Sequence, residues 1–247
     1  MKRWLAVTTA ACVLGPMADA AELKVIAGGS MTAPLNQLSP EFEKATGHKL
    51  SIHFDSTPNI IARVNSGTPF DVVVVPVDVF KDAAAKARVA PGPTIDIARV
   101  GYGVIVRTGA PKPDISTSDA FKKAMLAASS VAFLPASAAG AHITKVFERL
   151  GIAEEMKAKT KVQGAPAQIP QAVAKGEAEI GVFLSNVLVA PGVEPVGPFP
   201  DDLQQELVFT SAVAADTREA DTAQALIEFL RTPAAIAVIK GVGMTPG

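Results

Sequence analysis

The sequence predicts an α/β fold of two lobes, each a mainly parallel sheet flanked by helices, joined by two hinge crossovers. β-rich runs alternate with helical segments in the order β-α-β-α-β-α over roughly the first ninety residues. Residues 71–76 contain four consecutive valines, which is typical of a strand buried on both faces of a parallel sheet. Two longer strands, expected at 100–107 and 206–215, bracket a second α/β block. That block is therefore predicted to be inserted into the first lobe.

The first lobe is expected to comprise residues 21–99 and 214–247. Apolar Leu35, Leu38 and Phe42 recur at helical spacing, and Gly47 ends their helix. Alternation of apolar residues predicts the strand that follows, and Pro58 suits the first turn of the next helix. The predicted elements are strands at 23–27, 49–54 and 71–76, and helices at 32–46, 58–65, 79–88, 221–230 and 233–238.

The second lobe is expected to comprise residues 100–213. Gly151 and Gly176 end two of its predicted helices. The predicted elements are helices at 118–127, 139–150 and 169–175, and strands at 131–135, 178–184 and 193–196. Two lobes joined by two crossovers form a chain that closes like a hinge on something held between them.

The first twenty residues read MKRWLAVTTAACVLGPMADA, the layout of a secretory signal peptide. Lys2 and Arg3 precede an apolar run of about eleven residues, which is too short to span a bilayer that needs roughly twenty. Ala18 and Ala20 supply small residues before a cleavage site, so we expect cleavage after Ala20 and a periplasmic location. The alternatives are a buried N-terminal helix and lipid attachment at Cys12.

Composition excludes several classes of protein. Hydrophobic residues make up 49% of the 247 residues, which argues against disorder. With 23 Lys and Arg against 24 Asp and Glu, no positive excess exists to neutralise nucleic-acid phosphates. Cys12 is the single cysteine and lies in the predicted signal peptide, so the mature chain has no disulfide and no thiolate metal site.

Three loops with small or hydroxyl residues each follow a predicted strand and precede a predicted helix. They are residues 28–32, 55–59 and 136–140. Ligands of open α/β sheets bind at the carboxyl ends of strands, and a helix N-terminus attracts anions through its unpaired N–H groups. The loops therefore predict an anion site that needs no cation. The alternative is that Ser30, Ser56, Thr57 and Ser137 are ordinary helix caps.

Enzymatic and metal sites find less support. Residues 28–32 read GGSMT and have Thr where a nucleophile elbow of the form G-x-S-x-G has its last Gly. No pair of the three histidines has the i, i+4 spacing of a zinc site on a helix. We expect no enzymatic activity, no metal and no cofactor.

Several segments resemble the molybdate-binding periplasmic components of ABC transporters. They are "AELKVIAGGSMTAPLNQLSPEFEKATGHKLSIHF", "SGTPFDVVVVP", "ASAAGAHITKVFERLGI" and "AVAKGEAEIGV". The resemblance implies a type II periplasmic-binding-protein fold. It also implies that a small oxyanion of the molybdate or tungstate type is held by hydroxyls and backbone N–H groups and is handed to a membrane permease. We expect a monomer for such a shuttle.

The resemblance also implies positions for the ligand contacts. The family's binding serines fall on Ser30 and on Thr57, which has Ser56 beside it. Its backbone donor in the Ala-Gly loop falls on Ala139, and another backbone donor falls near Pro166 or Ala167. The family's binding tyrosine falls on Leu184, which donates nothing; the chain's single tyrosine, Tyr102, lies on an expected hinge strand. Ser185 and Asn186 follow Leu184 and are expected to supply a substitute. The candidate ligand-binding residues are Ser30, Ser56, Thr57, Ala139, Gly140 and Ser185.

Three other functions remain open from the sequence. The missing tyrosine makes an organic carboxylate or another anion an alternative ligand. A periplasmic sensor or adaptor that passes its signal to a partner is an alternative to import. A secreted serine hydrolase acting through Ser30 is the third.

Overall fold

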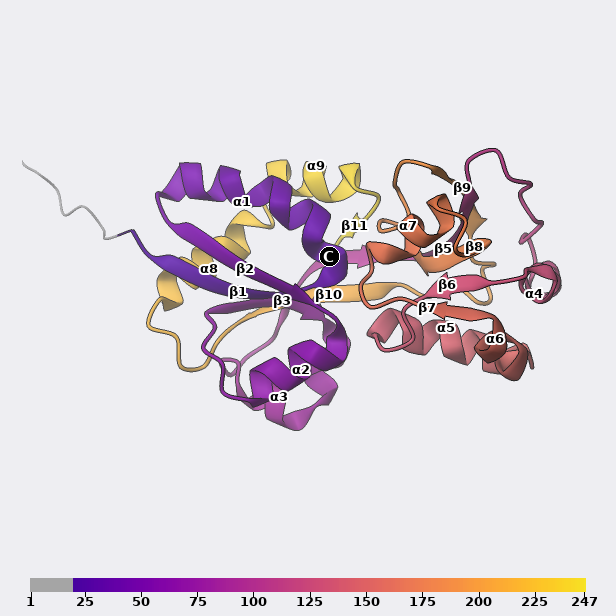
Figure 1. Ribbon diagram of the computed structural model, residues 1–247. Coiled ribbons are helices and arrows are strands. Elements are labelled where there is room, and N and C mark those ends of the chain that lie inside the picture. Colours follow the sequence, from indigo (N-terminus) through magenta and orange to yellow (C-terminus); the bar gives the residue numbers. More distant parts are fainter. Residues whose placement is uncertain (1–19) are drawn as a thin grey trace, which may run out of the picture.

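Two sheets, one in each of two lobes, organise residues 20–247, the part of the chain that the computed structural model describes (Figure 1). The predicted signal peptide falls on residues 1–19 and Ala20, so it lies almost wholly outside the described residues. Both the first and the last elements of the chain belong to one lobe, and the middle of the chain forms the other. The structure thus confirms the predicted two-lobed α/β fold.

The sheet of the first lobe has six strands in the order β11-β4-β10-β3-β1-β2. These strands are β1 (Glu22–Gly28), β2 (Lys49–Asp55), β3 (Val72–Pro76), β4 (Ile95–Val100), β10 (Leu207–Val213) and β11 (Thr245–Pro246). Its helices are α1 (Thr32–Thr46), α2 (Thr57–Asn65), α3 (Ala83–Ala87), α8 (Ala220–Phe229) and α9 (Pro233–Gly241), with 3-10 turns η1 (Gly29–Met31) and η2 (Val77–Lys81).

Alternation along the strands of the first lobe gives the sheet two buried faces. Val25 and its same-face neighbours pack in one cluster with Leu38 and Phe42 of α1 and with residues of α8 and α9. Ile26 points to the opposite face and packs in a second cluster with Ile60 of α2. Helices therefore cover both faces, as the run of valines in β3 requires.

The sheet of the second lobe has five strands in the order β7-β6-β8-β5-β9. These are β5 (Tyr102–Arg107), β6 (Val131–Phe133), β7 (Thr160–Val162), β8 (Ile180–Leu184) and β9 (Val193–Pro198). Its helices are α4 (Ser118–Ala127), α5 (Ala138–Arg149), α6 (Ala153–Lys159) and α7 (Gln168–Ala174).

Most strands of each sheet point the same way, as expected for mainly parallel sheets, but each sheet also contains antiparallel pairs. β1 pairs in parallel with β2 and β3, and β6 pairs in parallel with β7 and β8. The strands next to the crossovers, β4, β5, β9 and β10, make antiparallel pairs. Of these four strands, only β10 and β5 run against the parallel set of their sheet; β4 and β9 pair antiparallel with them and so point the same way as the parallel strands.

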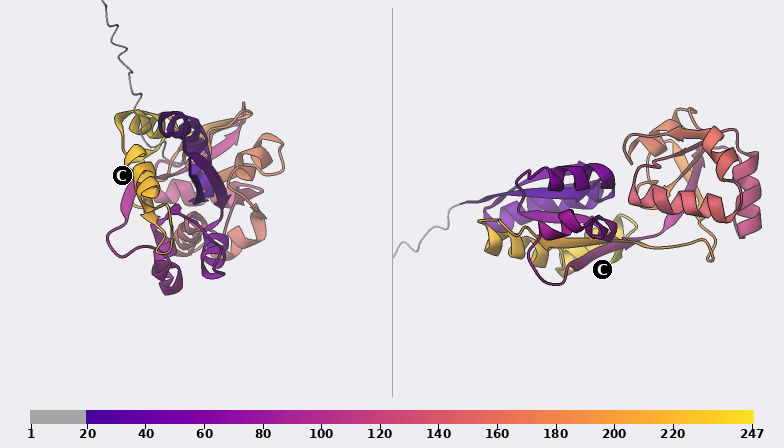
Figure 2. Two further views of the ribbon diagram at one scale, coloured as in Figure 1. Left: turned by 90° about the vertical axis from the view of Figure 1, so that its left-hand side faces the viewer. Right: turned by 90° about the horizontal axis from the view of Figure 1, so that it is seen from below.

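The two crossovers lie close together and connect β4 to β5 and β9 to β10 (Figure 2). The expected strand at 100–107 corresponds to β5, which begins at Tyr102. Val100 is instead the last residue of β4, in the other sheet, and Gly101 divides the two strands. The side chain of Gln204 accepts a hydrogen bond from the Tyr102 N–H (2.8 Å) and donates one to the Tyr102 carbonyl (2.9 Å). Gln204 thereby joins the second crossover to the first.

Other differences from the sequence prediction concern short elements. β10 belongs to the sheet of the first lobe, although residues up to 213 were expected in the second. The expected helix at 79–88 is the turn η2 followed by α3, because the Asp82 side chain accepts from the Ala85 N–H and starts a new helix. α6, β7, β11 and all of β4 except Val100 were not predicted.

Within residues 20–247, no single helix has the length and apolarity needed to cross a membrane; α8 and α9 meet those criteria only as a pair, bent by 60°.

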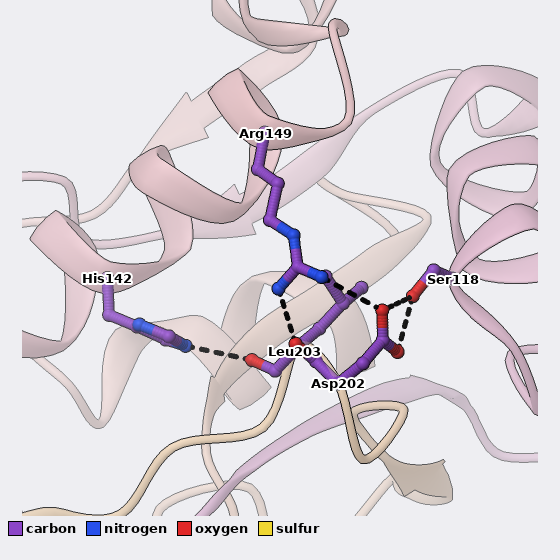
Figure 3. A network of polar contacts seen from close by, with 5 residues as sticks. All are labelled: Ser118, His142, Arg149, Asp202 and Leu203. Atoms are coloured by element: carbon purple, nitrogen blue, oxygen red, sulfur yellow. Dashed lines mark hydrogen bonds and ion pairs between the residues drawn. The ribbon is translucent and has the colours of Figure 1, made fainter.

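A polar network ties α5 to the second crossover (Figure 3). Arg149 of α5 pairs with Asp202, whose carboxylate also accepts from the Ser118 hydroxyl. Nearer the N-terminus of α5, His142 Nε2 donates a hydrogen bond to the Leu203 carbonyl at 3.0 Å. The His142 ring also packs on Tyr102, with ring centroids 4.5 Å apart. His142 therefore contacts both crossovers.

We predict that acid destabilises the protein through His142. Burial lowers the pKa of His142 below its ordinary 6.5, and Lys145 acts in the same direction, although the Leu203 carbonyl opposes them. The unfolded chain therefore binds this proton at a higher pH than the folded chain. Stability should fall as pH drops from about 6.5 toward the lowered pKa, and should then level off for this group.

The measurement is the urea midpoint between pH 8 and pH 5. His142→Gln, which keeps a donor for Leu203, should lose part of the slope in this range, whereas the control His48→Gln should retain it. An identical slope in His142→Gln and the unsubstituted protein would contradict this role of His142.

Candidate functional site

A small cavity lies between the two lobes, where the carboxyl ends of β1, β2 and β3 face the ends of β6 and β8. Its volume of about 20 Å³ is close to what one buried water needs, so the lobes are nearly closed on each other. The first lobe contributes Gly28, Gly29, Ser30, Asp55, Ser56, Thr57, Pro76, Leu207 and Phe209. The second lobe contributes Leu134, Ser137, Ala138, Ala139, Pro166, Phe183 and Leu184.

Two direct hydrogen bonds join the lobes beside the cavity. The Thr57 hydroxyl, at the start of α2, accepts from the Ala138 N–H at the start of α5 (3.1 Å). The Asn186 side-chain amide donates to the Ser30 carbonyl (2.8 Å). The N-termini of α2 and α5 thus face each other across the cavity.

Several donors around the cavity have no hydrogen-bond partner among residues 20–247. The hydroxyls of Ser30 and Ser56 are free in this sense, and Ser56 makes no side-chain cap to α2. The backbone N–H groups of Thr57 and Ala139 lie in the first turns of α2 and α5 and are also unpaired. These donors belong to residues of both lobes that line one small space, which is an arrangement suited to an anion.

Charged side chains contribute little to the cavity. Of the lining residues, only Asp55 carries an ionisable side chain. Its carboxylate accepts from the Ser56 N–H and the Asn59 amide, both at 2.7 Å, and lies 3.3 Å from His53 Nε2. Burial raises the pKa of Asp55, but these hydrogen bonds outweigh it, so the pKa lies below its ordinary value. The charge is thus held within its own loop.

No metal centre is formed by the part of the chain that the structure describes, since no group of three or more His, Cys, Asp or Glu side chains is suitably placed. Anion binding here would rest on neutral donors alone.

One side of the cavity is apolar. Leu184 at the end of β8 is fully buried and has Phe183 and Leu134 beside it. Leu207 and Phe209 of β10 extend this wall from the first lobe. The side chain that replaces the family's tyrosine therefore belongs to a continuous apolar surface.

The structure brings together four of the six candidate residues: Ser30, Ser56, Thr57 and Ala139 all line the cavity. Gly140 and Ser185 do not. The Gly140 N–H is taken by the Ser137 hydroxyl at 2.9 Å, which is an ordinary helix cap. The Ser185 N–H donates to the Gly101 carbonyl at 2.9 Å, and its side chain lines a groove beside β5 and β9 instead.

Residues near Leu184 take other places than expected. Pro166 lines the cavity but has no N–H to donate, and Ala167 lines a neighbouring cavity. Tyr102 is buried against His142 and Phe199, so it supplies no substitute hydroxyl. Asn186 is the polar residue after β8 that reaches the first lobe.

Sequence reasoning missed two groups of lining residues. Asp55 and Ser137 lie in two of the loops predicted to bind an anion, and their position directly after a strand could have indicated that they line the site. Leu207 and Phe209 had no such signal, because they reach the cavity from a crossover strand whose partner in the sheet is not evident from the sequence.

Residues 23–245 match the family of bacterial extracellular solute-binding proteins. The chain belongs to this family. An aconitate isomerase of Pseudomonas sp is 32% identical over 232 residues, covering 91% of this chain and 87% of that protein. The molybdate-binding protein ModA of Azotobacter vinelandii is 29% identical over 245 residues, covering 97% and 96%.

The fold agrees with solved structures of such proteins. The periplasmic molybdate-binding protein of Azotobacter vinelandii superposes with a TM-score of 0.76 at 20% identity, covering 91% of this chain and 99% of that chain. The resemblance to molybdate-binding components is thus confirmed, and the family places the protein outside the cytoplasm. The family is one of solute-binding proteins, and one relative of this chain is named as an enzyme.

We predict that Gly140→Ala destabilises the protein, because a Cβ at Gly140 would lie 1.9 Å from the Leu134 carbonyl oxygen. Such overpacking should cost about 2–3 kcal/mol in the free energy of unfolding. Gly241→Ala, at the end of α9 with open space around its Cβ, should instead be neutral or stabilise by roughly 0.5–1 kcal/mol. Urea unfolding of both variants measures this, and equal effects would contradict the packing role of Gly140.

Proposed function

We propose that this protein is the solute-binding component of an ABC importer, which holds a small anion between its lobes and delivers it to a membrane permease. The observation that carries the proposal is the ring of unpaired neutral donors supplied by both lobes around one cavity. Closure of the lobes removes these donors from water, and an anion between them would replace the lost hydrogen bonds. Membership of the solute-binding family supports the transport role.

A tetrahedral oxyanion of the molybdate or tungstate type is the first candidate ligand. It is small, it accepts hydrogen bonds on every side, and it needs no cation where helix N-termini face it. The hydroxyl and N–H donors of the residues that line the cavity support this choice. Relatives that bind molybdate match over nearly the whole chain.

An organic carboxylate is the second candidate, and the apolar wall favours it. Leu184, Phe183 and Phe209 offer nothing to an oxyanion's oxygen on their side, whereas a carbon skeleton would pack against them. A carboxylate group would still meet the donors of Ser30 and Ala139. The 32% identical aconitate isomerase acts on an organic acid, which supports the same choice.

We predict that Ser30 contributes to anion binding. In a thermal-shift screen of residues 21–247 with molybdate, tungstate, sulfate, phosphate and small carboxylates, the bound anion at a hundred times its Kd should raise Tm by roughly 5–10 °C. Ser30→Ala removes one donor to a charged ligand and should weaken binding about 10- to 100-fold.

The matched control is Ser39→Ala, because the Ser39 hydroxyl bonds only to the Leu35 carbonyl of its own helix. It should keep the affinity of the unsubstituted protein. An unchanged affinity in Ser30→Ala would remove the first loop from the site, and no shift with any anion would overturn the proposed function.

We also predict that the protein binds without catalysis. Isomerisation of aconitate needs a group that takes a proton from carbon, and such a base works best with a pKa near the working pH. Asp55 is the one ionisable side chain at the cavity, and its pKa is lowered, so it is a weak base. Incubation with cis- or trans-aconitate, followed by proton NMR, should show no interconversion above a buffer control. Turnover that Asp55→Asn abolishes would contradict this.

A further inference from the structure

A second and much larger cavity adjoins the one between the helix N-termini. Its volume is about 460 Å³, and it shares Gly29, Ser30 and Pro166 with the smaller cavity. Both lobes line it, so it is part of the same cleft. The second lobe's share comes mainly from α7 and from the segment after β8.

The two cavities adjoin where Gly29 of the first lobe meets Pro166 of the second. A Cβ at Gly29 would lie 3.1 Å from Pro166 Cγ, so the backbone of the first loop and the proline ring are already in close contact. Because residues of opposite lobes form this boundary, a small opening of the lobes merges the two spaces. A ligand longer than an oxyanion then has room in only one direction, toward the larger cavity.

Lys175 places a positive charge in the lining of the second cavity. Lys175 follows the last turn of α7, is exposed, and forms no ion pair within residues 20–247. The smaller cavity has no cation in its lining. The cleft as a whole therefore has neutral donors at one end and an available ammonium group at the other.

Asn186 lies where the two cavities adjoin. Its side chain is 7% exposed, and its Nδ2 donates to the carbonyl of Ser30, a residue that lines both spaces. Its Oδ1 is buried and has no partner among the described residues. A buried acceptor without a partner calls for a donor, so this position suits a ligand hydroxyl or a water that bridges Asn186 to the ligand, and the carboxylate oxygens belong elsewhere in the cleft.

Apart from Thr32 and Gln171, the remaining lining of the second cavity is apolar and suits a carbon skeleton. Pro166, Pro170, Ala174 and Val187 supply most of it. A fully polar ion gains nothing from such a surface, whereas an extended organic acid packs against it.

We propose that this cleft binds a di- or tricarboxylate: one carboxylate at the neutral donors of Ser30, Thr57 and Ala139, and an outer carboxylate in the second cavity against Lys175. The proposal rests on the proposed function and specifies its ligand class. Lys175 acts as the specificity-determining residue, because it lines the second cavity and not the small one, and so would attract the second negative group of a longer ligand.

Isothermal titration calorimetry on residues 21–247 tests this with acetate, succinate, citrate, trans-aconitate and molybdate as probes. The unsubstituted protein should bind at least one di- or tricarboxylate more tightly than acetate. Lys175→Met should weaken that binding about tenfold, since a charge-assisted contact is lost, and should leave any acetate or molybdate binding within about twofold. Lys175→Arg should restore most of the affinity. The control Lys123→Met, an exposed lysine of α4 at the far end of the second lobe, should change nothing.

Three other outcomes would each overturn part of this proposal. Tight di- or tricarboxylate binding that Lys175→Met leaves unchanged would overturn the assignment of Lys175. Binding of molybdate or acetate without any preference for a second carboxylate would overturn the ligand class while leaving the proposed function intact. Binding of none of the five probes would overturn both the inference and the anion-binding function on which it rests.

Discussion

Unpaired N–H and hydroxyl donors that face each other across the lobe interface set the behaviour of this protein. Thr57 and Ala139 begin helices in opposite lobes, and their N–H groups have no partner in the described chain. In an open form, water would satisfy them; on closure most of that water is expelled, and a bound anion would replace the lost hydrogen bonds. Closure of the lobes is therefore coupled to anion binding. Because the small cavity has no cation in its lining, the affinity for the anion depends on the number and direction of the neutral donors.

The crossovers connect this site to the rest of the fold. Gln204 of the second crossover is hydrogen-bonded to Tyr102 beside the first crossover, and His142 of α5 contacts both crossovers. The N-terminus of the same helix lies at the cavity, which Ala138 and Ala139 line. A rotation of the second lobe about Gly101 would thus move the N-terminus of α5 as a rigid unit, since its far end is held by Arg149 and Asp202.

The sequence was sufficient to predict the loops of the site, because strand ends followed by helix starts are local features. The loops that hold Ser30, Thr57 and Ala139 were predicted in this way, and the resemblance to the molybdate-binding components singled out these residues within them. Gly140 and Ser185 were misplaced for reasons that only the tertiary structure supplies: Ser137 takes the Gly140 N–H as a cap, and Gly101 takes that of Ser185. The mixed sheets and the wall formed by Leu207 and Phe209 depend on how the crossover strands pair, which periodicity does not reveal.

The central claim is that one anion contacts both lobes through neutral donors, and NMR amide resonances test it most directly. In a titration of isotope-labelled protein with its tightest-binding anion, the N–H signals of Thr57 and Ala139 should both shift, with a single shared Kd and a 1:1 stoichiometry. Shifts at only one of these amides, or two different dissociation constants, would show that the ligand binds one lobe alone and would contradict the account.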